Sequence, residues 1–226
     1  MLSTTNLELT HLIIFGAYAV QALELLLFPV QSEFTTYGIL RRHRQENSVG
    51  LISQMMNRAL LAALAAGTII SVGTFLLPLG LILVPEMYQQ LVPIPHLHTP
   101  IAALAANCAI ILGSCLTGIA VLQFHAMNSP RRSLITSGVF GFCRNPISVG
   151  LMAMVAGFFL AFPSWIGLFG TGVYMLNTHV RIRMEEHFLE QHFGAEYHRY
   201  KRYTGRYLPV TAGRISDGNL FQDSRE

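Results

Sequence analysis

The sequence has few charged residues, and a long central stretch has no lysine or arginine at all. Only 12% of its 226 residues are charged, against about 25% in ordinary soluble domains. No Lys or Arg occurs between Ala59 and Pro130, and eight of the fifteen basic residues lie at or after Arg181. This distribution indicates an integral membrane protein with a polar C-terminal part. The net charge of +3 gives no reason to expect nucleic acid. Anionic lipid head groups are the more natural neighbours of the basic clusters.

Cysteine is also scarce, and this excludes a disulfide framework. Cys108, Cys115 and Cys143 form neither an even set nor a CxxC pair, so we expect packing roles for them. His96 and His98 have no third ligand nearby in sequence, so we expect no metal site. The first apolar segment has neither a basic leader nor a small-residue cleavage site, and we expect it to be retained.

Four apolar blocks dominate the chain, at residues 9–30, 59–84, 101–124 and 147–180, the second of them interrupted by Pro78. Since a spanning helix needs about 20 residues, the fourth block is too long for one span, and Pro163-Ser164 divides it. We predict an all-α integral membrane fold with five transmembrane helices. The last two form a tight hairpin, and cytoplasmic helices follow at the C-terminus. Gln21 and Glu24, inside the first block, should face the protein interior, either in a helix–helix hydrogen bond or lining a cavity.

The loops between these blocks alternate in charge. Residues 31–58 and 125–146 contain arginines, whereas residues 85–100 contain no Lys or Arg. The positive-inside rule then predicts an N-terminus outside and a C-terminus in the cytoplasm.

The predicted hairpin brings two polar segments to the same side of the membrane, namely Arg144-Asn145 before it and residues 181–186 after it. Asn145 and Pro146 suit the N-cap and first positions of the following helix. Arg144 is either an interfacial anchor or part of a ligand site. Glu185 and Glu186 point about 100° apart on a helix. They either pair with Arg181 or Arg183 on a solvated turn or face a ligand.

Beyond the hairpin, the pattern predicts two further helices separated by a glycine. Apolar and aromatic residues recur at helical spacing up to Phe193, and Gly194 suits a C-cap. The second helix should begin near Ala195 and present Tyr197 and Tyr200 on neighbouring faces.

Two linked motifs flank the hairpin, SLITSGVFGFCRNPISVG before it and EEHFLEQHFGAEYHRYKRYTGRYLP after it. Together they resemble the isoprenylcysteine carboxyl methyltransferase family and its bacterial relatives, over residues 133–210. The matching residues are Gly138, Phe142, Arg144, Asn145, Pro146 and Gly150 before the hairpin, and Glu185, Glu186, Leu189, Phe193, Gly194, Tyr197, Tyr200, Arg206 and Pro209 after it.

This resemblance implies a membrane methyltransferase that uses S-adenosylmethionine (SAM), in a bacterial inner membrane with its donor site facing the cytoplasm. The acceptor would be lipophilic, or a small thiol or carboxylate, and membrane lipid the main partner. By position, the resemblance implies catalytic roles for Arg144 and Arg206. The cofactor-binding residues would be Phe142, Arg144, Asn145, Pro146, Gly150, Glu185, Glu186, Tyr197 and Tyr200. Residues 1–130 would form N-terminal membrane helices, 131–212 the SAM-binding core and 213–226 a flexible tail.

Four positions depart from the family pattern. Val139 and Phe140 replace a proline and a tyrosine, Ser148 replaces a tyrosine, and Tyr203 stands where eukaryotic members place an arginine. These departures bear on the acceptor more than on the cofactor. Two alternatives stay open, an NAD(P)H-dependent membrane reductase of related fold and a non-catalytic membrane protein.

Overall fold

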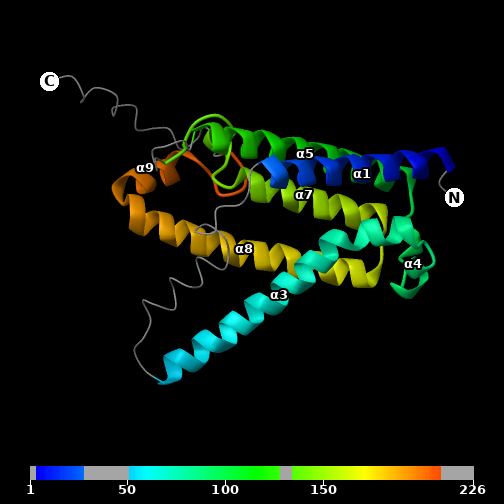
Figure 1. The fold of residues 1–226 in the computed structure, drawn as a ribbon, viewed down its shortest axis with the longest axis horizontal. Coiled ribbons are helices and arrows are strands. Elements are labelled where there is room, and N and C mark those ends of the chain that lie inside the picture. The colour runs from blue at the N-terminus through cyan, green and yellow to red at the C-terminus, as the bar shows by residue number, and fades with distance from the viewer. Residues whose placement is uncertain (1–3, 28–50, 128–133, 210–226) are drawn as a thin grey trace.

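The computed structural model describes residues 4–27, 51–127 and 134–209, and the secondary structure in these ranges is helical (Figure 1). The long helices are α1 (Thr4–Leu27), α3 (Leu51–Leu83), α5 (Pro100–Met127), α7 (Pro146–Ala161) and α8 (Trp165–Phe193). Shorter helices are α4 (Met87–Gln90), the 3-10 turn η2 (Pro95–Leu97), α6 (Val139–Phe142) and α9 (Ala195–Tyr203). The arginines predicted to mark the inner loops, Arg41, Arg42, Arg44, Arg131 and Arg132, and the tail 213–226 lie outside the described residues.

The helical hairpin is formed by α7 and α8, and it turns where the sequence predicts. Ser164 is fully buried, and its hydroxyl accepts a hydrogen bond from the backbone N–H of Gly167 at 3.1 Å, which caps α8. With 16 residues, α7 is shorter than an average membrane span. In contrast, α8 continues without a break for 29 residues, well past the apolar block, to the predicted stop at Gly194. The first of the two further helices predicted beyond the hairpin is therefore the end of α8 and not a separate helix, and α9 is the second. Gly194 has a φ of +50°, which favours glycine.

Helices α5 and α7 make the most extensive contact among the described helices, and glycines let them approach closely. A Cβ atom on Gly150 would lie 2.6 Å from the Gly113 carbonyl oxygen and 2.3 Å from the Thr117 hydroxyl oxygen. On Gly157 it would lie 2.8 Å from the Ala106 carbonyl oxygen. Such small residues let two helix backbones approach closely, as in many membrane helix pairs.

The other long helices pack around this pair. Helix α1 lies on α5 and α7, and the Tyr18 ring stacks on Phe158 of α7 and meets Phe75 of α3 edge-on. Helix α3 packs mainly on α8 and contains Pro78 without ending there. Near the other end of α1, Glu24 packs towards Gly118 of α5, and one oxygen of its carboxyl is buried with no hydrogen-bond partner in the described part of the chain.

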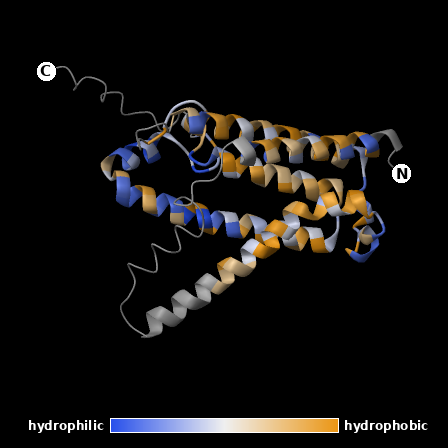
Figure 2. Cartoon of the chain, viewed as in Figure 1, coloured by the Kyte–Doolittle hydropathy of each residue, from blue (hydrophilic) through white to orange (hydrophobic). Residues whose placement is uncertain are grey.

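The apolar side chains lie largely on the outside of the molecule. Two helical stretches, Ala62–Leu83 and Pro100–Met127, are long and apolar enough to cross a membrane by length and composition, and α7 is a shorter apolar helix. In the most apolar part of each stretch, only 17% of the residues of the first and 33% of those of the second are buried. The core helix of a soluble protein, in contrast, is mostly buried. Figure 2 shows hydrophobic residues along these helices and hydrophilic ones gathered around α9 and the end of α8. Five spans and the N-outside orientation remain predictions.

The connection between α3 and α5 packs on the hairpin turn, and we call this region the turn end. The backbone N–H of Ile94 donates to the Pro163 carbonyl at 2.9 Å, and that of Trp165 donates to Val92 at 3.0 Å. The Tyr88 hydroxyl also donates to the Pro163 carbonyl, at 2.7 Å, and lies 2.7 Å from Nε2 of His98. This connection is therefore ordered and fixes the turn.

Candidate functional site

The opposite end of the molecule, formed by the start of α7, the end of α8 and α9, is called the α9 end. There the chain beyond α9 runs back beside the start of α7 (Figure 1). Cys143 and Gly205 form an isolated parallel bridge, and the backbone N–H of Arg144 donates to the Gly205 carbonyl at 2.8 Å. Lys201 of α9 also pairs with Glu190 of α8. These contacts place the two sequence motifs side by side.

The centre of the α9 end is a cluster of three charged side chains, the buried Arg144 and Glu186 and the partly exposed Arg206. Nε and Nη2 of Arg144 both donate to Oε1 of Glu186 at 3.1 Å. Nε and Nη2 of Arg206 donate to Oε2 of the same carboxylate at 2.9 and 2.6 Å. The predicted meeting of Arg144 with the segment after the hairpin is thus confirmed. Two guanidinium groups share one carboxylate, so the cluster carries a net positive charge.

Arg144 also fixes the backbone that follows α9. Its Nη1 donates to the carbonyl oxygen of Lys201 at 3.3 Å and to that of Thr204. The side chain is only 8% exposed. The N–H groups of Arg144 thus donate to Glu186 and to these carbonyls. These contacts join the start of α7, α8 and the C-terminal segment. Arg206 is different, because one third of its side chain is exposed.

Each charged group of the cluster stabilises the ionised form of its partner. Burial by itself would raise the pKa of Glu186, but hydrogen bonds and charge from Arg206 and Arg144 outweigh it and hold that pKa below its usual value. The same hydrogen bond to Glu186 raises the pKa of Arg206. Glu186 is therefore a carboxylate at neutral pH, with both of its oxygens occupied.

Glu185 lies on a different face of α8, as adjacent helical residues must. Its carboxylate lies 3.6 Å from Nε of Arg181, and about a third of each side chain is exposed. That Arg181 nitrogen is buried and has no hydrogen-bond partner among the described residues. Burial raises the pKa of Glu185, against the opposing charge of Arg181. Compared with Glu186, Glu185 is loosely held and open to solvent.

The two predicted tyrosines lie on the buried face of α9. Tyr197 is 1% exposed and Tyr200 is 8% exposed, and their ring centroids are 6.0 Å apart. The Tyr200 hydroxyl donates to the Phe140 carbonyl at 2.5 Å. Burial raises the pKa of both phenols, so both remain protonated at neutral pH. The bond from Tyr200 ties α9 to α6.

The remaining predicted site residues are distributed around this centre. Asn145 occupies the N-cap position of α7 with Pro146 after it, but the Asn145 amide caps no helix N–H and instead donates to the Arg206 carbonyl at 3.2 Å. Pro146 is fully buried. Phe142 is 67% exposed, outside the charged cluster. Gly150 lies in the α5–α7 contact described above, so its observed role is close helix packing.

One pair at this end escaped the sequence prediction. Nδ1 of His179, on α8, lies 2.6 Å from the hydroxyl oxygen of Tyr207, which directly follows Arg206. The sequence holds a partial signal, because His179, Ile182 and Glu186 recur at helical spacing and share a face of α8. Nothing local to Tyr207 predicts its partner, since the contact depends on the return of the C-terminal segment.

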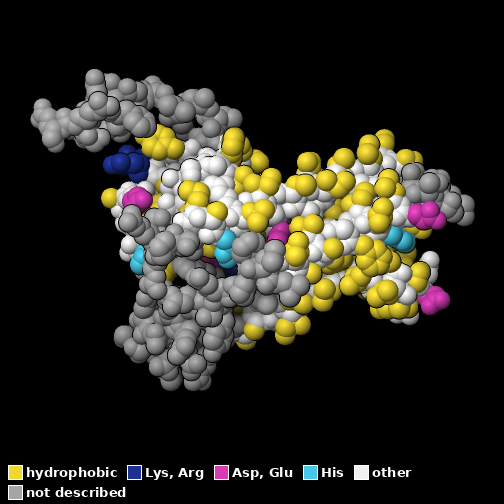
Figure 3. Space-filling model, turned by 45° about the horizontal axis from the view of Figure 1, so that its top comes forward, with side chains coloured by type: hydrophobic (Ala, Val, Ile, Leu, Met, Phe, Trp, Pro, Cys, Tyr) yellow, Lys and Arg dark blue, Asp and Glu magenta, His cyan; other side chains and the backbone are white. Residues whose placement is uncertain are grey.

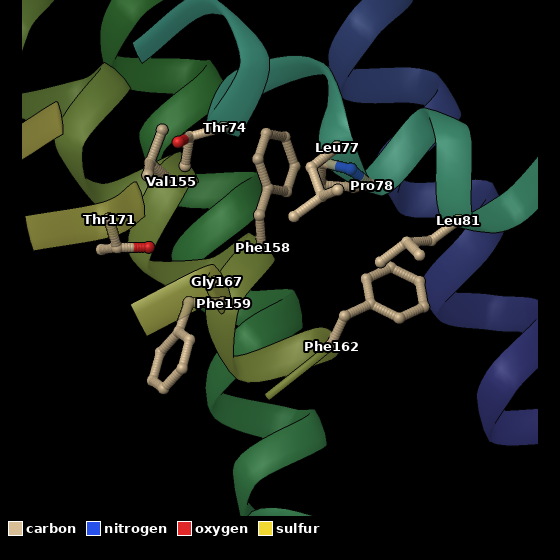
Figure 4. Close-up of a pocket in the computed structure, with 10 residues that line it drawn as sticks. All are labelled: Thr74, Leu77, Pro78, Leu81, Val155, Phe158, Phe159, Phe162, Gly167 and Thr171. Atoms are coloured by element: carbon tan, nitrogen blue, oxygen red, sulfur yellow. The ribbon is translucent and has the colours of Figure 1, made fainter. Parts of the chain in front are cut away.

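A small apolar crevice lies near the turn end, between α3, α7 and α8 (Figure 4). Its volume of about 10 Å³ is room for about one water molecule. It is lined by Thr74, Leu77, Pro78, Leu81, Val155, Phe158, Phe159, Phe162, Gly167 and Thr171. None of these side chains is ionisable, so the crevice does not compete with the α9 end as a reaction site.

Comparison with known proteins supports part of the sequence-based assignment. The model of the phospholipid methyltransferase family (PEMT) matches residues 103–196. This family belongs to the same superfamily as the isoprenylcysteine carboxyl methyltransferases. The matched segment runs from α5 through α8 to the start of α9 and contains Arg144, Glu185 and Glu186. No curated protein and no solved structure gives a match. The segment is thus similar to SAM-using membrane methyltransferases, and the narrower isoprenylcysteine assignment has no support beyond the motifs.

Proposed function

We propose that this protein is an integral membrane methyltransferase that transfers a methyl group from SAM to a lipophilic acceptor. The observation that carries this proposal is the family match over residues 103–196, which includes two of the three residues of the charged cluster. The match favours methyl transfer over the reductase alternative. The proposal places the reaction at the α9 end, where the hydrophilic residues gather at one end of the apolar helices (Figure 2).

The residues at the α9 end fit the charged and polar parts of SAM. Arg206, with one third of its side chain exposed, suits the carboxylate of the methionine part. Glu185 suits its ammonium group or the ribose hydroxyls. Nε of Arg181 lies 3.6 Å from the Glu185 carboxylate and has no hydrogen-bond partner among the described residues, so it offers a further donor. In this proposal the walls of the pocket are formed by Arg144, Asn145, Pro146 and Glu186, together with Tyr197 and Tyr200 on the buried face of α9.

When bound, SAM would supply an electrophilic methyl group on a positively charged sulfur. The protein then needs to align the acceptor with that methyl and to exclude water. The Arg144–Glu186–Arg206 cluster serves alignment, because it fixes the C-terminal segment to both helices of the hairpin. A Ser-His-Asp or metal constellation is not required for this reaction.

The family name points to a lipid acceptor, and we propose one for this chain. A bilayer location, a cytoplasmic donor site and a core comprising residues 131–212 belong to the same proposal. Bacterial origin and a prenylcysteine, thiol or carboxylate acceptor rest on the motif resemblance alone. Phe142 and Gly150 are the weakest of the proposed pocket residues, given the exposure of the first and the packing of the second.

Titration calorimetry on the detergent-purified protein tests the donor assignment. We expect saturable SAM binding that is weakened by Glu185→Gln, while NADPH gives no heat of binding. Binding of NADPH in place of SAM would favour the reductase alternative, and binding of neither would favour a non-catalytic role. The acceptor class then follows from incubation with methyl-labelled SAM and lipid extracts, prenylcysteine analogues or small thiols. Label in the lipid fraction is the expected result.

A further inference from the structure

Helix α9 and the segment that follows it are attached to the molecule in different ways. The side chains of Tyr197 and Tyr200 anchor α9, because both are buried. Residues 204–208, which we call the strap, contribute no buried apolar side chain, and Leu208 is largely exposed. Detaching the strap therefore exposes little apolar surface and costs little hydrophobic free energy.

The strap lies beside the start of α7, where its backbone pairing is limited to one isolated bridge. Cys143 and Gly205 form this parallel bridge, and the backbone N–H of Arg144 donates to the Gly205 carbonyl at 2.8 Å. The Asn145 amide donates to the Arg206 carbonyl at 3.2 Å. An isolated bridge has fewer backbone hydrogen bonds than the ladder of a sheet, so this side of the strap can open locally.

Two side chains hold the strap to α8 on its other side. Nη2 of Arg206 donates to Oε2 of Glu186 at 2.6 Å, and the Tyr207 hydroxyl lies 2.6 Å from Nδ1 of His179. Glu186 follows His179 by seven residues, so the two contacts lie on one face of α8, about two turns apart. The strap thus crosses from the start of α7 to α8 and is fastened there at two points.

The strap is bonded to two buried charges of the α9 end. The Thr204 carbonyl accepts a hydrogen bond from Arg144, and Arg206 occupies one oxygen of Glu186. The side chains of Arg144 and Glu186 are only 8% and 5% exposed. In the proposed function these two residues form walls of the donor pocket. A ligand that contacts them must therefore displace bonds that the strap makes.

We propose that the strap opens about the end of α9 to admit SAM and closes over it, with the contact between His179 and Tyr207 as a latch. This inference rests on the proposed methyltransferase function. Thr204 is the C-cap of α9 and has extended backbone angles, with φ −126° and ψ 129°, so the helix ends there and the strap begins. Helix α9 stays in place during opening because its tyrosines anchor it. Closure then excludes water from the bound donor.

A disulfide that locks the strap tests this proposal. Neighbouring strands lie about 4.7–4.9 Å apart, which is within the Cα separation that a disulfide spans. Gly205→Cys therefore places a thiol opposite Cys143. Cys108→Ala and Cys115→Ala remove the other two cysteines of the chain. Copper phenanthroline oxidises the two thiols to the disulfide, and dithiothreitol reduces it again.

The order in which SAM and the oxidant are added distinguishes the outcomes. We expect the variant oxidised before SAM is added to lose its heat of binding in calorimetry, and dithiothreitol to restore it. Oxidation after SAM is added should trap tritiated SAM through gel filtration. The control carries Cys108→Ala and Cys115→Ala alone and should show neither effect. Normal binding and release of SAM by the locked variant would overturn the proposal.

Tyr207→Phe tests the latch without a new cysteine. Loss of this hydrogen bond should raise the open fraction of the strap roughly 5-fold. Because the latch forms with and without SAM, association and dissociation should both become faster by that factor, at an unchanged dissociation constant. Rapid filtration with tritiated SAM measures both rates, and Tyr203→Phe, at the half-exposed last residue of α9, is the matched control. Unchanged rates, or faster dissociation alone with weaker affinity, would contradict the proposal.

Hydrogen exchange reports on the strap without SAM. The backbone N–H of Arg144 donates to the strap, so its exchange follows opening, and the amides within α9 are the reference. We expect Arg144 to exchange faster than these amides, and Tyr207→Phe to accelerate Arg144 roughly 5-fold while leaving α9 unchanged. A common rate for Arg144 and α9 would show that both open as one unit, against the proposal. If the wild type binds no SAM, the proposed function is wrong, whereas exchange still tests the strap.

Discussion

The two ends of the α7–α8 hairpin are held by different kinds of interaction. At the turn end, the Pro163 carbonyl, the Tyr88 hydroxyl and backbone N–H groups form neutral hydrogen bonds. At the α9 end, two guanidinium groups and one carboxylate hold three segments together. On the face that Figure 3 shows, acidic and histidine side chains lie towards both extremities of the apolar body, and the Lys and Arg side chains in view lie towards one of them.

This difference has a physical consequence for function. The neutral hydrogen bonds to the Pro163 carbonyl fix geometry and carry no charge for an ionic ligand to meet. A charged cluster costs several kcal/mol to desolvate, so it is weak evidence for stability. It does provide fixed charges where a charged ligand would bind. The turn end is therefore suited to structure, and the α9 end to recognition.

The largest expected effect comes from Glu186→Ala. This change leaves the buried Arg144 and the partly exposed Arg206 without the carboxylate that both bind. Removing one partner of a buried ion pair typically costs about 3–5 kcal/mol. The matched control is Glu185→Ala at the next position, which removes only the partly exposed pair with Arg181 and should cost about 0–1 kcal/mol. Thermal unfolding in detergent measures both. Equal losses from the two changes would contradict the different roles assigned to these glutamates.

A smaller effect is expected from Tyr88→Phe at the turn end. The change removes the hydrogen bond to the Pro163 carbonyl, which still accepts from Ile94, and the contact with Nε2 of His98, so the cost should be about 1–2 kcal/mol. Affinity for SAM should not change, because the turn end is remote from the α9 end. Thermal unfolding measures the loss of stability, and calorimetry with SAM measures the affinity. The control is Tyr203→Phe, because the Tyr203 side chain is half exposed. Weaker SAM binding in Tyr88→Phe would remove the functional distinction between the two ends.

The smallest effect concerns acid, and only the α9 end should show it. Burial would raise the pKa of Glu186, but its bonds to Arg206 and Arg144 hold that pKa below the usual 4.5. As pH falls below about 4.5, the unfolded chain takes up a proton first. The stabilisation is therefore complete above that pH and is lost as the pH falls through the lower folded value.

The unfolding midpoint measured between pH 7 and pH 3 checks this sign. Glu186→Gln should reduce the acid-induced loss. Glu185→Gln should act in the opposite sense, because burial raises the pKa of Glu185 and its contribution is lost as pH rises. Identical pH profiles for the two variants would show that the neighbouring carboxyls do not differ as described.

Local signals in the sequence predicted much of the fold. The turn at Pro163-Ser164, the end of α8 before Gly194 and the start of α9 at Ala195 all follow from capping and breaking residues, which act over a few positions. The prediction for Asn145 was right in part. This residue does occupy the N-cap position of α7, but its side-chain amide donates to the Arg206 carbonyl and caps no N–H group of the helix. The short helices α4 and α6 carry too few residues for a periodic pattern.

The partners within the candidate site depend on contacts far apart in the chain. The sequence indicated that Glu185 and Glu186 must point in different directions, but not which one meets Arg144. That choice depends on the rotation of α8 about its axis, which is set by packing against α3 and α7. The contacts of Arg206 and Tyr207 required, in addition, the return of the C-terminal segment beside Cys143.

Because α8 is one continuous helix, its length sets the distance between the turn end and the α9 end. At about 1.5 Å per residue, its 29 residues fix the separation of the hairpin turn from Gly194 at roughly 43 Å. Because the helix is continuous, the depth at which Trp165 lies also sets the depth of His179 and Glu186. Inserting a single residue after Thr178 would rotate the turn end by about 100° relative to Glu186 and lengthen the helix by about 1.5 Å. The register of one helix thus decides how far from the bilayer the charged cluster lies.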